Sequence, residues 1–129
     1  VYKRQETLFL DEDDPFMELL LCPPTGEASQ PYLHVKPGRK TEVRAAWNER
    51  FGKRFALLDT AEAEELELFG PGGLIAAAKS RIGDFIAISP APATLYFRSA
   101  GYKPDIHKGV HAGLRPAEMR IPLVVCRNS

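Results

Sequence analysis

Residues 107–125 read HKGVHAGLRPAEMRIPLVV. The stretch joins a glycine-containing loop to Pro116, which is preset for a first helical turn, and then to the apolar run 121–125. We expect that run to be a strand that anchors the segment in a core. Small residues follow His111, so a bound ion can come close to its imidazole, which is a good ligand for Zn²⁺ when neutral. Local chemistry supports two interpretations of His111 equally: a metal ligand or part of a structural turn.

His111 cannot make a zinc site alone, because zinc in proteins takes about three or four protein ligands. His107 lies four residues earlier, a spacing that would place both rings on one helix face. Gly109 between them and Pro104 before them disfavour a helix at this point. The two histidines are therefore not predicted to act as a pair.

The composition is that of an ordinary globular domain, with 44% hydrophobic and 26% charged residues in a chain of 129. Lys and Arg together number 17, as do Asp and Glu, so the formal net charge is zero. No apolar run approaches the roughly 20 residues that span a bilayer. We therefore expect neither nucleic acid nor a membrane as a partner. The compartment stays open, with a cytoplasmic location as the default expectation.

The chain opens with VYKRQ and has no initiator Met. This pentapeptide resembles translated adaptor sequence, so we interpret residues 1–5 as a non-native scar and leave them out of the fold prediction. The chain is then expected to be a fragment of a longer protein.

Hydrophobic patterns along the chain predict both strands and helices, as in an α/β fold. The expected strands are 7–10, 16–22, 32–35, 54–58, 85–88 and 94–97, and the expected helices are 41–50 and 60–68, with a weak helical turn at 74–80. We expect 16–22 and 32–35 to form a wide hairpin, and 94–97 to pair back onto 85–88.

Individual residues refine this outline. Thr41 is expected to cap the first helix, and Asp59 with Glu62 to form a capping box at the second. His34 lies inside an expected strand, which predicts a structural role. Cys22 and Cys126 are far apart in apolar runs, which predicts buried free thiols.

Two motifs carry a family resemblance. The run KGVHAGLRPAEMRIPLV, residues 108–124, resembles the C-terminal motif of the type I phosphodiesterase/nucleotide pyrophosphatase branch of the alkaline phosphatase superfamily, where Gly-x-His-Gly-Gly-Leu-Ser-Pro-Glu-Glu-Met precedes a Val-Pro-Leu strand. The run RIGDFIAI, residues 81–88, is similar to the strand that returns the chain to that family's core. Ala112 replaces a family glycine, and Arg115 replaces the helix-capping serine. The second change predicts a weaker turn, or one capped in another way.

The resemblance implies hydrolysis of small-molecule phosphate esters by two divalent metal ions, usually Zn²⁺, with a Thr or Ser nucleophile. Only one functional residue carries over, the metal ligand His111. The nucleophile, the metal-binding aspartates and an Asp-His-Gly motif have no counterpart here, so no catalytic residue is assigned and the chain alone is expected to be inactive. The implied fold is α/β, with a cap- or insertion-like α+β segment at 6–80 and a C-terminal return to an alkaline phosphatase-like, metal-binding core at 81–129.

Other interpretations remain open. Within the same superfamily, the parent protein can be a phosphatase, a phosphomutase or a sulfatase. From a different class, the chain can be a complete non-catalytic α/β binding module in which the loop at His111 is only a turn.

Overall fold

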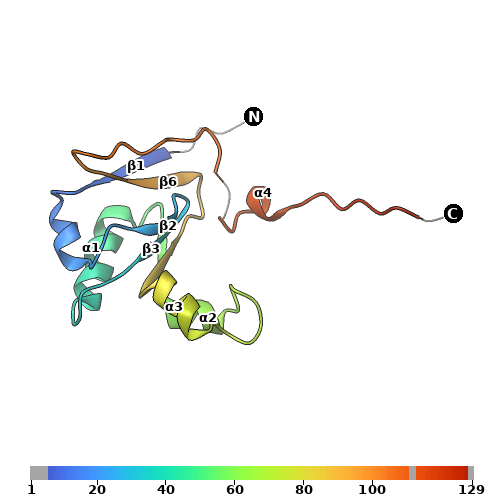
Figure 1. Ribbon diagram of the computed structural model, residues 1–129, viewed down its shortest axis with the longest axis horizontal. Coiled ribbons are helices and arrows are strands. Elements are labelled where there is room, and N and C mark those ends of the chain that lie inside the picture. Colours follow the sequence, from blue (N-terminus) through green and yellow to red (C-terminus); the bar gives the residue numbers. More distant parts are fainter. Residues whose placement is uncertain (1–5, 111–112, 128–129) are drawn as a thin grey trace.

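The computed structural model describes residues 6–110 and 113–127. Helices and strands alternate irregularly along the chain, which confirms the predicted mixture of the two (Figure 1). In chain order the elements are β1 (Glu6–Asp11), the 3-10 helix η1 (Pro15–Leu19), β2 (Thr25–Glu27), β3 (Gln30–Leu33), α1 (Lys40–Phe51), β4 (Ala56–Asp59), α2 (Thr60–Glu65), α3 (Ala76–Ile82), β5 (Phe85–Ile88), β6 (Ala93–Arg98) and α4 (Pro116–Met119).

The strands form two sheets. The larger has four antiparallel strands in the order β2-β3-β5-β4, and the smaller consists of β1 and β6 in parallel. Each sheet takes strands from both sides of residue 80, since β5 lies between β3 and β4 and β6 pairs with β1. Segments 6–80 and 81–129 therefore share their sheets in this chain.

The main core is built around Trp47 of α1, which is completely buried. Its ring centroid lies 4.8 Å from that of Phe51, 5.9 Å from that of Phe55 and 6.0 Å from that of Phe16. The indole N–H donates to the carbonyl of Phe55 at 3.3 Å, so the one polar group of the ring is satisfied. These contacts join η1, α1 and the start of β4 into one unit.

Both predicted helices are present, but only the second is capped as expected. At α2, Asp59 accepts from the N–H of Ala61 at 3.0 Å and its own N–H donates to Glu62 at 2.7 Å, which confirms the capping box. At α1 the predicted cap Thr41 is wrong, because the helix begins one residue earlier, at Lys40, and its N-cap residue Arg39 makes no side-chain cap bond.

The strand predicted at 16–22 is wrong. Asp14 accepts from the N–H of Phe16 at 2.9 Å and Pro15 occupies the first position, so the chain starts a 3-10 helix instead. Of the wide hairpin, only a single bridge between Leu20 and Val35 forms. The hairpin observed is the tighter one between β2 and β3.

The pairing predicted between 94–97 and 85–88 is also wrong. Strand β5 already has β3 on one side and β4 on the other, so it offers no free edge. Strand β6 instead pairs in parallel with β1, from Glu6 opposite Ala93 to Asp11 opposite Arg98.

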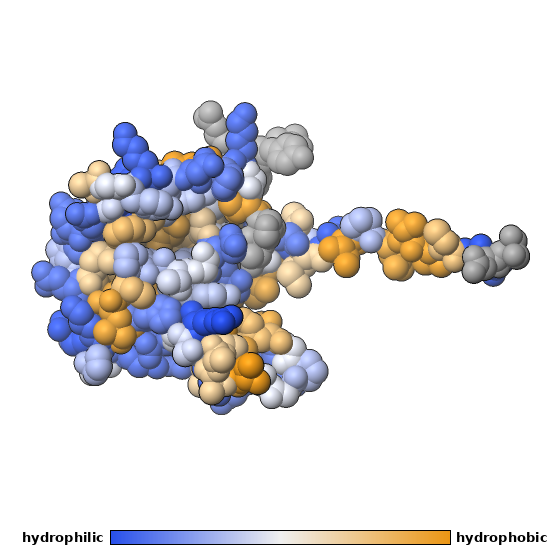
Figure 2. All heavy atoms as spheres, in the orientation of Figure 1, coloured by the Kyte–Doolittle hydropathy of each residue, from blue (hydrophilic) through white to orange (hydrophobic). Residues whose placement is uncertain are grey.

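The apolar run expected to be a core strand is exposed. Ile121, Leu123, Val124 and Val125 are 85%, 88%, 81% and 80% exposed, and Cys126, expected to be buried, is exposed as well. Cys22 is only half-buried. Figure 1 shows residues 120–127 as an extended tail projecting away from the body, and Figure 2 shows its apolar surface. The prediction of a buried strand is wrong for this chain, because within its described residues no strand edge pairs with the tail.

Candidate binding pocket

The structure places the three histidines in different settings. His111, the predicted metal ligand, lies outside the described residues. His34 follows β3, and its Nε2 lies 3.2 Å from the hydroxyl of Thr25, as expected for a structural residue. His107 is exposed and lines a pocket. Within 6–110 and 113–127, no three His, Cys, Asp or Glu side chains form a group that could hold a metal ion.

Residues 113–119 form a short, tightly closed turn. Pro116 starts α4, and Arg115 gives no capping bond, as its lack of a side-chain oxygen predicts. Arg115 instead donates to the carboxylate of Glu118 at 2.9 Å. Gly113 is buried against that carboxylate, and a Cβ added there would clash with Oε2. Only glycine therefore allows this approach of Glu118 to the backbone.

Glu118 lies in the short helix α4, yet its side chain is only 6% exposed, which is unusual for a carboxylate. Oε2 accepts from Arg115, whereas Oε1 is buried and has no hydrogen-bond partner in the described part of the chain. A buried acceptor normally finds a donor or a cation. The motif at 113–118 thus holds one carboxylate oxygen that no described residue bonds.

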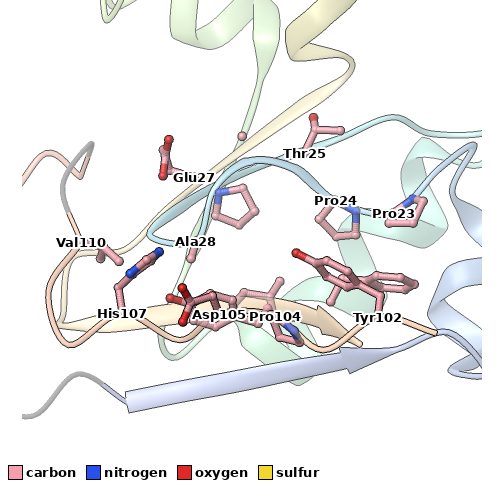
Figure 3. Close-up of a pocket in the computed structure, with 15 residues that line it drawn as sticks. Pro23, Pro24, Thr25, Glu27, Ala28, Tyr102, Pro104, Asp105, His107 and Val110 are labelled. Atoms are coloured by element: carbon pink, nitrogen blue, oxygen red, sulfur yellow. The ribbon is translucent and has the colours of Figure 1, made fainter. Parts of the chain in front are cut away.

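A separate hollow of about 410 Å³ lies between the hairpin at 23–28 and the loop that follows β6. We call it the hairpin pocket. Figure 3 shows the hairpin residues Pro24 and Glu27 on one side, with Tyr102, Asp105 and His107 on the other. Its size is that of a site for a small molecule.

The hairpin pocket joins an apolar surface to a negative one. Prolines and aromatic rings make up much of its wall, and its charged lining groups are Glu27 and Asp105. Among the described residues that line it there is no lysine or arginine. The hydroxyl of Tyr96, another lining residue, is enclosed and lacks a hydrogen-bond partner among the described residues.

The negative charge of Glu27 affects the ionisation of the neighbouring Tyr32. Burial raises the pKa of Tyr32, and the nearby carboxylate of Glu27 raises it further. Both effects disfavour a second negative charge beside this hairpin.

Sequence patterns alone do not reveal the hairpin pocket. Pro23-Pro24 and the residues around Tyr102 are each typical of turns, but they are about eighty positions apart in the chain. They come together because the N–H of Leu95 in β6 donates to the carbonyl of Ala28 at 2.8 Å, fixing the hairpin against the strand that leads into the loop.

Comparisons with known proteins give no match: no protein-family model, no curated protein and no solved structure is similar to this chain. Among the described residues, no helix is both long and apolar enough to cross a membrane.

Proposed function

We propose that this chain is part of a metal-dependent phosphoesterase of the phosphodiesterase/nucleotide pyrophosphatase type, in which His111 is one metal ligand. The observation that carries the proposal is the run KGVHAGLRPAEMRIPLV at residues 108–124, which resembles the C-terminal metal-binding motif of that family. Segment 81–129 would then belong to an alkaline phosphatase-like core, completed by the rest of the parent protein.

The exposed tail supports this proposal. Four of its apolar side chains are at least 80% exposed, an arrangement that gains stability when another surface covers it. An extended segment can pair its backbone with the open edge of a sheet. We infer that residues 121–125 add a strand to the core sheet of the parent protein and so fix the loop that carries His111.

Glu118 supplies a second argument. Its carboxylate is buried three residues before the run 121–125 and leaves Oε1 without a partner among the described residues. Such an oxygen suits a neighbouring cation or N–H group supplied by the complete protein.

Within 6–110 and 113–127 no three candidate side chains gather into a metal-binding group. The proposal therefore assigns the other ligands to the parent protein. When bound, two zinc ions would polarise the nucleophile and stabilise charge on the transferred phosphoryl group. In this proposal, the chain supplies one metal ligand, His111, from the segment between β6 and α4.

The test is to express the protein with its upstream coding sequence and measure hydrolysis of bis-p-nitrophenyl phosphate. The extended protein should hydrolyse the ester and retain zinc through dialysis, whereas the 129-residue chain should do neither. An extended protein that is folded yet inactive toward phosphate mono- and diesters would contradict the proposal.

One observation favours a second candidate, a non-catalytic α/β binding module. The body has its own core around Trp47 and a pocket to which, of the described residues of the motif, only Val110 contributes. In that case the isolated chain should be monomeric and unfold in one cooperative transition, with a normal denaturant slope.

A further inference from the structure

We propose that the hairpin pocket binds a small organic cation of the quaternary ammonium or protonated amine class. The inference does not depend on the phosphoesterase proposal, because it uses neither the metal-ligand role of His111 nor a bound metal ion.

Charge is the first argument. The pocket brings Glu27 of the hairpin and Asp105 of the loop to one hollow, and no cationic side chain lines it among the described residues. An anionic ligand would meet two carboxylates there without compensation, whereas a cation would be attracted by both. The pocket is therefore selective for positive charge.

The aromatic lining is the second argument. Tyr102 lies across from Pro24 and is 56% exposed, so part of its ring remains free to meet a ligand (Figure 3). Phe97, in β6, also lines the hollow. The faces of such rings attract ammonium groups.

The remaining wall distinguishes an organic cation from a metal ion. Pro23, Pro24 and Val110 present apolar surface, which a hydrated metal ion does not need and which methyl or methylene groups can contact. His107 adds a ring nitrogen that can accept a hydrogen bond from an amine when the imidazole is neutral. A hard metal ion would instead need several convergent oxygens, and the described residues offer no such group.

The experiment is an NMR titration of the ¹⁵N-labelled 129-residue chain, in which the amide signals report where a ligand binds. The probes are choline, its neutral isostere 3,3-dimethyl-1-butanol, and adenosine monophosphate as an anionic competitor. Choline should shift the amides of Glu27, Ala28, Tyr102 and Asp105, and its affinity should exceed that of the neutral isostere by about five-fold or more. Adenosine monophosphate should leave these amides unshifted.

Matched variants test the assignment. Glu27→Gln and Asp105→Asn should each weaken choline binding about two- to five-fold, and together more. Tyr102→Ala should weaken it by a similar factor. Glu49→Gln, an exposed carboxylate on α1 outside the pocket, should have no effect. All four positions are exposed, so the spectrum of each variant is expected to remain that of the folded protein.

The proposal is overturned if choline causes no saturable shifts at these amides or binds no better than the neutral isostere. It is equally overturned if the double variant Glu27→Gln, Asp105→Asn binds as tightly as the unmodified chain, or if adenosine monophosphate occupies the pocket. These outcomes leave the phosphoesterase proposal untouched, because they concern neither metal content nor hydrolysis.

Discussion

The carboxylate of Asp84 accepts a hydrogen bond from the backbone N–H of Val35 at 2.8 Å, across 49 residues of sequence. Asp84 lies just before the central strand β5, and Val35 lies just beyond the neighbouring strand β3. The N–H of Asp84 in turn donates to the carbonyl of Leu33 at 2.9 Å. This reciprocal contact fixes where the two strands begin to pair.

Asp84→Ala should lower the free energy of unfolding by about 1–3 kcal/mol, because it leaves the N–H of the buried residue Val35 without its partner. Asp84→Asn should cost less, since an amide oxygen can still accept the bond. Urea unfolding of the two variants checks this. Equal stability of Asp84→Ala and the unmodified chain would show that the contact is not stabilising.

Gly83→Ala should be destabilising by about 1–3 kcal/mol, because φ is +82° and ψ is −145° there, a conformation that only glycine adopts freely. An added Cβ would also lie 2.7 Å from Nδ1 of His34 and 2.8 Å from the carbonyl oxygen of Leu33. Gly101→Ala is the control, since it meets nothing within 4 Å. Thermal unfolding of both variants should show a lower Tm for Gly83→Ala alone; equal Tm values would contradict the account.

The stability contributed by Asp59 should depend on pH. Burial opposes its ionisation, but the hydrogen bonds from Lys40 and from the N–H of Ala61 outweigh it and hold the pKa below the usual 3.8. A lowered pKa means that this contribution is complete above pH 3.8 and is lost as the pH falls through the lower value in the folded protein.

The stability difference between the unmodified chain and Asp59→Asn should therefore be constant from neutral pH down to about pH 5 and shrink below about pH 4. Urea unfolding over this range measures it. The exposed variant Glu49→Gln serves as a control and should show little difference at any pH. A difference that does not change with pH would exclude ionisation of Asp59 as its source.

Removal of all residues after Arg120 should change the free energy of unfolding by less than about 0.5 kcal/mol, because residues 121–127, the described part of that segment, are exposed. The same truncation should reduce self-association, because it removes an exposed apolar segment that can pair with a sheet edge of another copy of the chain. Sedimentation velocity compares the two chains. A large loss of stability on truncation would mean that the tail packs on the body.

Local signals were sufficient to predict part of this fold. The helix around Trp47, the capping box of Asp59 with Glu62, and the apolar strand at 85–88 each depend on residues close in sequence. The prediction of a strand at 16–22 was wrong for a local reason as well. Its apolar pattern suggested a strand, but Asp14 and Pro15 favour a helical turn.

What could not be predicted depends on distant partners. The pairing of β6 with β1 joins positions 87 residues apart, and nothing in 94–97 distinguishes that edge from the edge of β5. The hairpin pocket also depends on distant partners, because it needs the hydrogen bond from the N–H of Leu95 to the carbonyl of Ala28, 67 residues earlier. The exposed run 121–125 has the pattern of a buried strand, but a pattern cannot tell whether the covering surface is in the same chain.

The central claim, that His111 is a metal ligand of a larger phosphoesterase, is tested most directly by zinc stoichiometry. The protein would be expressed with its upstream sequence as the unmodified form, His111→Ala and His107→Ala, dialysed, and analysed for bound zinc by atomic absorption. We predict that His111→Ala loses zinc, while His107→Ala, which changes only the exposed pocket residue, retains the zinc content of the unmodified protein. Unchanged zinc content in a folded His111→Ala protein would contradict the claim.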